Sequence, residues 1–284
     1  MDKLNRLYSN EMHVHVTLEE CRALEVVFSG GIIGSCCARD YFDDLGIVLS
    51  ETHGVDYVYW DARLNRASPP YYLVRYARID FLDELKKVMP EAEPMVKKRI
   101  EEFAKVGASM NPDRIFSELC FCILTANCSA EGGIRIQQTV GDGFRSIEQK
   151  ELTSILRSLG YRFPNRRSEF ICTAKGSIPK IMDALHMDDR MAREWLVENI
   201  KGIGYKEASH FLRNIGRNDL AIIDRHVLRF LLQKGLILKT PKSLSRTSYM
   251  AFETLLAKIS EKLGITLAEL DLYIWYLMTG KVLK

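Results

Sequence analysis

Residues 192–216 constrain the fold most strongly, because they predict two helices separated by a very short turn. The centre of this segment reads KGIGYKEASHFLRN, in which Gly202 and Gly204 lie where the first helix must end and the second must begin. Glycine has no side chain, so a G-x-G turn lets the backbone approach a phosphate group closely. The second helix also presents free N–H groups and the positive end of its dipole at this turn. We therefore predict a phosphate-binding helical hairpin.

The same part of the chain supplies two candidate catalytic groups. Lys206 falls in the first turn of the second helix, and Asp224 follows the apolar run of residues 220–223. A helix N-terminus disfavours the charged form of a nearby lysine, and partial burial acts in the same direction, so we expect a neutral amine nucleophile at Lys206. Asp224 can cap the helix that follows, and a carboxylate there can also stabilise a developing positive charge. Both roles for Asp224 can hold at once.

The composition is that of a protein with a substantial core in a reducing compartment. The chain has 284 residues, of which 47% are hydrophobic, and this is enough for one large or two modest domains. It shows no membrane-spanning apolar run and no secretory signal, which predicts a cytoplasmic protein. Its seven cysteines are an odd number without a disulfide framework, and none follows Cys172. His13 and His15 lack further ligands nearby, so we predict no metal and no cofactor.

The net charge of +3 hides an asymmetry between the two ends of the chain. Residues 1–77 contain 7 Lys and Arg against 11 Asp and Glu, which gives −4 and leaves +7 for residues 78–284. Neutralisation of phosphates supplies most of the non-specific affinity of proteins for DNA. A basic part that also contains the hairpin therefore agrees with a nucleic-acid partner, although the excess is modest.

Residues 1–77 predict a small α+β domain with antiparallel strands. Short segments rich in β-branched and aromatic residues alternate there with turn formers. The sequence after Gly30 and Gly31 lacks a phosphate-binding loop pattern, so we expect a hairpin or the start of a helix at this point. The role of the domain stays open between extending a DNA-binding surface, binding a protein and shielding a hydrophobic face. The predicted strands are residues 13–17, 23–28, 46–49, 57–60 and 71–78.

From residue 80 onward the hydrophobic period becomes that of helices. Residues 81–107 predict two helices, with Pro90 and Pro94 marking the break between them. The next helix begins near Pro112, and its apolar stripe predicts the central core helix of a helical body. That stripe consists of Ile115, Leu119, Cys122 and Ile123.

Three blocks of this sequence resemble one family of DNA-repair enzymes. They are KGIGYKEASHFLRN, ELCFCILTANCSAEGGIR at residues 118–135, and the last residues WYLMTGKVLK. The chain resembles the helix-hairpin-helix superfamily of DNA glycosylases and, more narrowly, the type-2, mainly archaeal, 8-oxoguanine DNA glycosylase/lyases. The resemblance covers residues 78–284 and implies a mainly α, two-part helical body with the hairpin at about residues 192–216, preceded by the small α+β domain. It also implies that Lys206 is the nucleophile and that Asp224 stabilises charge at the sugar.

The resemblance further implies which residues contact the damaged base and the DNA. Trp275 and the terminal Lys284 match a tryptophan that stacks on the base and a lysine whose α-carboxylate enters the pocket. Phe163 is expected as one wall of that pocket, with core packing as the alternative. Gly202 and Gly204 are expected to contact DNA, and so are three residues around the hairpin. These are Asn127, which otherwise terminates a helix, Arg166, which lies among interleaved aromatic residues, and His226.

The function predicted from these residues is excision of 8-oxoguanine from double-stranded DNA, followed by cleavage of the strand. Lysine attack at C1′ gives a Schiff base, and β-elimination then cuts the strand without a metal or another cofactor. A monomer in the cytoplasm, associated with the nucleoid and not with a membrane, is expected. Two alternatives stay open: a glycosylase of the same superfamily for another damaged base, and a non-catalytic helix-hairpin-helix module that binds DNA. The sequence leaves open the opposite-base preference and the base edge that the carboxylate reads.

Overall fold

The computed structural model describes residues 82–284 in full, apart from residues 127, 235, 238, 239 and 242, and only the backbone of the ordered elements before residue 82. The chain divides into two compact units. The strand unit consists of Met1–Met89 and Arg225–Ile265, and the hairpin unit consists of Pro90–Asp224 and Thr266–Lys284. The predicted boundary between residues 77 and 78 stays a prediction.

The strand unit contains antiparallel strands and two later helices. Four strands form a sheet in the order β1-β6-β5-β4, and β2 pairs with β3 in a separate ribbon. The residues after Gly31 form strand β3, so the hairpin alternative for this point is the one observed, whereas the predicted list of strands lacked β3. The elements are β1 (Glu11–Thr17), β2 (Leu24–Phe28), β3 (Gly31–Cys36), β4 (Val48–Thr52), β5 (Val55–Asn65), β6 (Tyr71–Arg78), α10 (Arg225–Gln233) and α11 (Arg246–Leu263).

Helix α2 (Phe81–Ala108) is continuous, so the predicted break between two helices is wrong. Pro90 and Pro94 both lie inside it. Their spacing of four residues places both rings on one face of the helix, and both are exposed. The carbonyl groups that lose a backbone donor there can bond to water, which lets the helix continue through two residues that usually end one.

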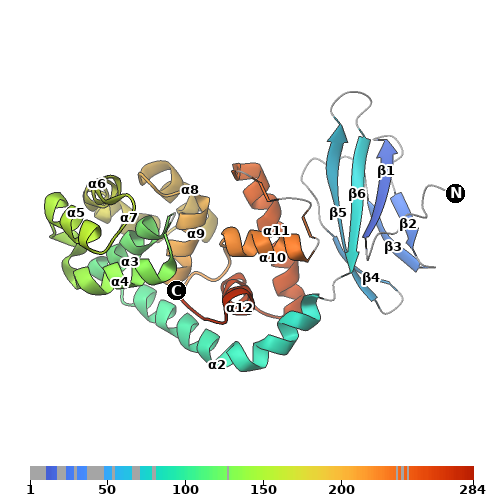
Figure 1. Ribbon diagram of the computed structural model, residues 1–284, viewed down its shortest axis with the longest axis horizontal. Helices are drawn as coiled ribbons and strands as arrows, with labels where there is room; N and C mark the ends of the chain where they lie inside the picture. Colours follow the sequence, from blue (N-terminus) through green and yellow to red (C-terminus); the bar gives the residue numbers. More distant parts are fainter. Residues whose placement is uncertain are drawn as a thin grey trace. The chain divides into compact units, whose positions relative to one another are not determined.

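The body of the protein is mainly helical, as predicted, and the hairpin unit is built of helices alone within its described residues (Figure 1). No helix in the described part of the chain is both long and apolar enough to cross a membrane. The remaining elements are α3 (Pro112–Thr125), α4 (Ala130–Val140), the 3-10 helix η2 (Gly141–Arg145), α5 (Gln149–Ser158), α6 (Pro164–Lys175), α7 (Ile178–Ala184), α8 (Asp189–Asn199), α9 (Tyr205–Asn214) and α12 (Leu267–Thr279).

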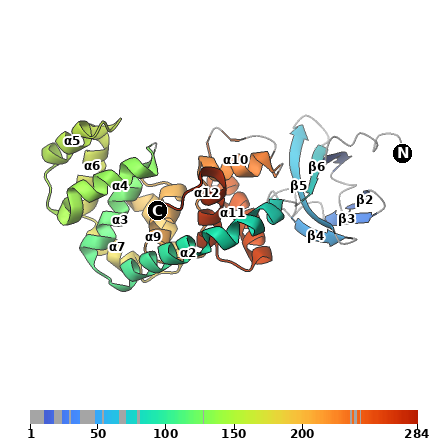
Figure 2. The ribbon, with the colours of Figure 1, turned by 60° about the horizontal axis from the view of Figure 1, so that its bottom comes forward.

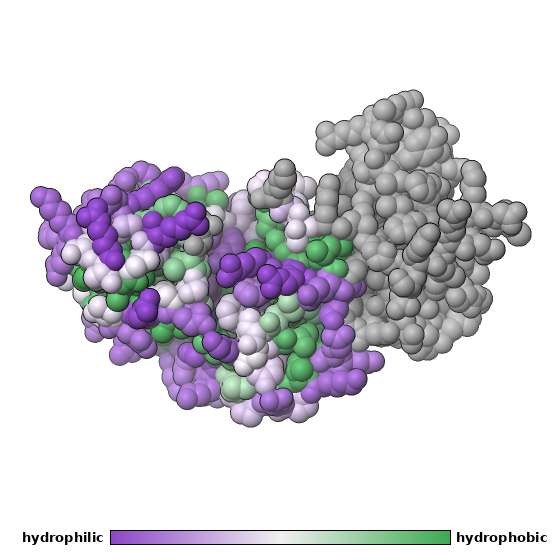
Figure 3. Space-filling view, in the orientation of Figure 1, coloured by the Kyte–Doolittle hydropathy of each residue, from purple (hydrophilic) through white to green (hydrophobic). Residues whose placement is uncertain are grey.

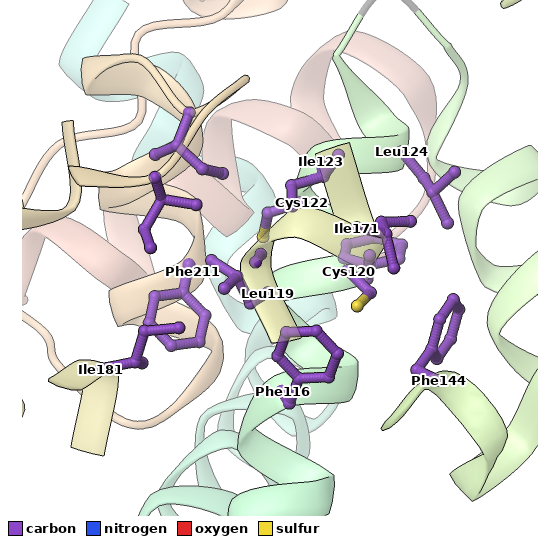
Figure 4. Packing of buried hydrophobic residues seen from close by; sticks show 14 of the residues in the cluster. Phe116, Leu119, Cys120, Cys122, Ile123, Leu124, Phe144, Ile171, Ile181 and Phe211 are labelled. Atoms are coloured by element: carbon purple, nitrogen blue, oxygen red, sulfur yellow. The ribbon is translucent and has the colours of Figure 1, made fainter. Parts of the chain in front are cut away.

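Helix α3 is the centre of the hydrophobic core, as its apolar stripe predicts. Every residue from Ile115 to Thr125 is buried, and α3 packs against α4, α6, α7, α9 and η2 (Figure 2). Phe144, Ile171, Ile181 and Phe211 from four other elements point toward it (Figure 4). A helix that is apolar on all sides needs partners on all sides. Helix α3 therefore fixes where α9, the second helix of the hairpin, lies.

Helix α2 approaches the end of α9 so closely that only glycine fits at the contact. A Cβ atom on Gly107 would lie 2.0 Å from the carbonyl oxygen of Ile215. Gly216 has a φ of +87°, and a Cβ atom there would lie 2.9 Å from Cα of Ala104. Backbone atoms cannot move aside as flexible side chains can, so the two glycines permit this helix contact.

We expect Gly107→Ala to lower the free energy of unfolding by about 1–3 kcal/mol, because the added methyl group overlaps backbone atoms of Ile215. This cost outweighs the better helix propensity of alanine. Urea denaturation measures the change. Gly143→Ala is the matched control, because its new Cβ atom would meet nothing nearer than 3.8 Å. Equal stability of the two variants would contradict the close contact.

Candidate nucleic-acid interface and active site

The hairpin consists of α8, a turn over residues 200–204, and α9. Gly202 has a φ of +91°, and a Cβ atom on it would lie 2.3 Å from Cδ2 of Phe170, whose ring is buried. Gly204 has an extended backbone and is the N-cap of α9. The backbone conformation therefore requires glycine only at position 202. At position 204 the absence of a side chain leaves the N–H groups at the start of α9 accessible.

Lys206 lies in the first turn of α9, where its side chain is 24% exposed. Its Nζ atom is 4.0 Å from Oε1 of Glu207. Glu207 in turn accepts a hydrogen bond of 3.3 Å from the N–H of Gly204, which satisfies one of the free donors at the start of the helix. The amine is thus half-buried beside the turn and close to a carboxylate.

A group of basic side chains surrounds the ring of Phe170 next to the turn. Arg166, Arg167 and Lys201 place their charged groups 5.4, 5.6 and 5.3 Å from the ring centroid. Arg167 is buried and donates to the carbonyl of Ala126, whereas Arg166 and Lys201 are exposed. Hydrophilic side chains also gather over α5 and α6 in Figure 3. Arg166 was predicted from the sequence; Lys201, which directly precedes Gly202, was missed although its position signals it.

Helix α12 brings Trp275 to Asp224. The helix begins with a capping box of Thr266 and Glu269 and ends at Gly280, whose φ of 71° gives the left-handed cap that the sequence predicts. Nε1 of Trp275 donates a hydrogen bond of 3.4 Å to Oδ2 of Asp224. The indole is half-buried, so one of its faces can be open to a ligand while its N–H orients the carboxylate.

A buried ion pair lies beneath these groups. Nη1 of Arg213 on α9 lies 2.7 Å from Oδ2 of Asp271 on α12, and both side chains are almost fully buried. The pKa of Asp271 is raised to about 7, mainly by burial. The positive charges of Arg213 and Lys206 oppose this rise, whereas the carboxylate of Asp224 adds to it. Both candidate catalytic groups thus act on the same buried carboxyl.

Lys284 enters a buried polar cluster on α3. Its Nζ atom lies 2.5 Å from Oε1 of Glu118, which is 7% exposed. Asn214 of α9 donates to the other oxygen of Glu118 at 3.0 Å. Glu118 and Asp271 were not predicted from the sequence, although each is a carboxylate within an otherwise apolar helix, and that pattern was the available signal.

Three predicted residues are less closely tied to this arrangement. Phe163 precedes α6 and is 39% exposed, with the guanidinium of Arg162 lying 4.9 Å from the centre of its ring. His226 is the second residue of α10 and belongs to the strand unit. Asn127 lies outside the described residues. Their predicted roles stay predictions.

Two helices joined at a glycine turn, with a lysine at the start of the second helix and an aspartate after it, define a helix-hairpin-helix protein. A family profile described as 8-oxoguanine DNA glycosylase matches residues 96–265, which is more than half of the chain.

Curated relatives and solved structures point to the same family. The 8-oxoguanine DNA glycosylase/AP lyase of Methanocaldococcus jannaschii is 51% identical over 205 residues, a match that covers 72% of this chain and 97% of the relative. The crystal structure of the 8-oxoguanine DNA glycosylase of Thermotoga maritima has a TM-score of 0.70 at 46% identity and covers 72% of this chain and 99% of its own. The M. jannaschii glycosylase/lyase in complex with 15mer DNA containing 8-oxoguanine has a TM-score of 0.70 at 48% identity, with the same coverage. The chain belongs to the 8-oxoguanine DNA glycosylase family.

Asp271 predicts a pH dependence of stability. The carboxyl ionises near its ordinary pKa of 3.8 in the unfolded chain but holds its proton to about pH 7 in the native state. The native state therefore binds more protons between these values, so the contribution of Asp271 to stability falls as the pH rises from about 4 to about 7. We expect Asp271→Asn to flatten this part of the profile, measured as the thermal midpoint at several pH values. Asp113→Asn at an exposed carboxylate is the control, and parallel profiles for the parent and Asp271→Asn would contradict the shift.

Proposed function

We propose that this protein excises 8-oxoguanine from double-stranded DNA and then cuts the strand at the resulting site. The proposal is supported by membership of the family and by relatives that carry the name 8-oxoguanine DNA glycosylase/AP lyase. The observation that carries it is that the ion pair of Arg213 and Asp271 joins α9, which carries Lys206, to α12, whose Trp275 is hydrogen-bonded to Asp224. A module that only binds DNA needs the glycine turn but neither Lys206 nor Asp224.

Lys206 is the nucleophile in this proposal. Its free amine attacks C1′ of the damaged nucleotide, the bond from C1′ to the base breaks, and the base leaves with the electron pair. Ring opening of the sugar gives a Schiff base between Nζ and C1′. The Schiff base acidifies the proton on C2′, and removal of that proton expels the 3′ phosphate by β-elimination. No step needs a metal or another cofactor.

Asp224 stabilises the positive charge that develops at the sugar as the base departs. The indole N–H of Trp275 donates to one carboxylate oxygen of Asp224 and so helps to fix the orientation of that carboxylate. A fixed carboxylate costs no reorganisation during the reaction. Trp275 thereby orients the catalytic carboxylate while its half-buried ring is available for stacking on the extruded base.

The base is read by Trp275, Lys284 and Phe163. The α-carboxylate of Lys284 is the specific element, because a carboxylate only accepts hydrogen bonds and 8-oxoguanine carries an N–H at N7 that guanine lacks. Phe163 is exposed enough to contribute a second aromatic wall.

The DNA backbone is bound by the hairpin and the basic groups beside it. Gly202 and Gly204 let a phosphate approach the start of α9, and Arg166 pairs with phosphate oxygens, as we propose for Lys201 too. His226 and Asn127 are the further proposed contacts. We propose that the protein acts as a monomer, since one hairpin unit supplies all the proposed catalytic and base-reading groups.

Borohydride trapping on a duplex with a single 8-oxoguanine tests the proposed chemistry. The parent protein is expected to form a covalent adduct on the lesion and none on undamaged DNA, because borohydride reduces the Schiff base to a stable amine. Lys206→Gln should form no adduct. Lys180→Gln, at an exposed lysine on α7, is the control and should react like the parent. Tight binding by the parent without an adduct or release of base would favour the binding module.

One residue added after Lys284 tests how the base is read. The addition moves the negative charge away from its place, so we expect the rate of 8-oxoguanine excision to fall by about 10- to 100-fold. Trapping at a preformed abasic site, where no base remains to be read, should change by less than about twofold. Unchanged excision would favour the alternative that the enzyme acts on a different damaged base.

A further inference from the structure

The segment after α12 is held at two points within the hairpin unit. Terminal segments usually fray unless they are tied down. Here Nζ of Lys281 lies 3.1 Å from Oε1 of Glu131, in a pair whose two side chains are more than half exposed. Nζ of Lys284 lies 2.5 Å from Oε1 of Glu118, and these side chains are only 16% and 9% exposed. The second contact is the buried one, and it fixes residue 284 itself.

The carboxylate that receives Lys284 is held on both of its oxygens. Nε2 of Gln137 on α4 donates to Oε1 of Glu118 at 3.2 Å and also to Oγ of Ser117 at 3.0 Å. Nδ2 of Asn214 on α9 donates to Oε2 at 3.0 Å. Three helices, α3, α4 and α9, therefore determine the position of one carboxylate.

Because Glu118 is buried, its carboxylate needs the ammonium group of Lys284 as a partner. A buried carboxylate without a positively charged partner is costly, and two neutral amide donors compensate it only in part. The ammonium also lies 4.8 Å from the ring centroid of Phe121, which is a cation–π contact. Glu118 therefore needs a positively charged side chain at position 284.

Phe121 contacts both the ammonium group of Lys284 and the imidazole of His210 on α9. The imidazole of His210 on α9 packs edge-on against Phe121, with 5.5 Å between the ring centroids. Burial holds the pKa of His210 well below its usual value, and the positive charges of Arg213, Lys206 and Lys284 lower it further. The side chain of Lys284 is therefore attached to α3 through Glu118 and Phe121, and Phe121 in turn contacts α9 at His210, one turn after Lys206.

We propose that Glu118 is a positioning residue that acts through the ammonium of Lys284 to place the main-chain end of residue 284 for discrimination of 8-oxoguanine from guanine. This inference rests on the proposed function. Glu118 touches neither base nor sugar in this scheme. It fixes the group that does, and Gln137 and Asn214 fix Glu118.

The experiment compares single-turnover excision of 8-oxoguanine and of guanine by the parent and by Glu118→Gln. Selectivity is expected to fall by about 10- to 100-fold, because small displacements of a recognition group are costly. Borohydride trapping at a preformed abasic site should stay within about twofold, which shows that the variant is folded and that Lys206 reacts. Glu131→Gln removes the exposed ion pair of the same segment and is the matched control, expected to keep the parental selectivity.

Lys284→Met, alone and combined with Glu118→Gln, tests whether the two residues act together and replaces the first variant if that one does not fold. Lys284→Met should lose selectivity to a similar extent, and the double variant should be no worse than either single one. Parental selectivity in Glu118→Gln, or in Lys284→Met, would overturn the inference, as would losses that multiply in the double variant. A parent that forms the abasic-site adduct but excises no 8-oxoguanine would overturn the proposed substrate, and the inference with it.

Discussion

The buried ion pair between Arg213 and Asp271 is the interaction on which the arrangement of the candidate site depends. It joins α9, which carries Lys206, to α12, which carries Trp275, across 58 residues of sequence. Removing either side chain would leave the other buried without its partner, so the pair couples the positions of the two helices. The guanidinium also lies 4.8 Å from the ring centroid of Phe103 on α2, which ties the same point to a third helix.

Buried polar groups in this unit serve to fix geometry more than to add stability. Hydrophobic residues could fill the same volume at less electrostatic cost. Instead, Arg213 also donates to Oδ1 of Asn214, so the ion pair and the cluster around Glu118 share the last turn of α9. The apolar core places the helices approximately, and the polar contacts then restrict each helix to one register and rotation. A site that must hold a nucleophile, a carboxylate and an aromatic ring together needs these polar contacts, because hydrophobic packing alone does not fix the rotation of each helix.

The sequence predicted the features that depend on local chemistry. The glycine turn, the central position of α3 and the left-handed end of α12 at Gly280 each follow from a few neighbouring residues. Features that depend on distant partners could not be predicted. Glu118 and Asn214 are 96 residues apart, and the sequence around either residue gives no indication that the two side chains form a hydrogen bond. The predicted break in α2 at Pro90 and Pro94 was wrong for a related reason. The helix continues because both prolines are exposed, and their exposure depends on the tertiary fold. Strand β3 was missed because its register with β2 is set by pairing.

The placement of two thiols in the central helix has a consequence for oxidative conditions. Cys120 and Cys122 are completely buried in α3, and burial raises the pKa of both thiols. Peroxides react with the thiolate, so a thiol that keeps its proton and has no access to solvent oxidises slowly. The helix that organises the core is therefore resistant to the same chemical stress that produces oxidised bases. A protein proposed to repair such damage can keep its fold while that stress lasts.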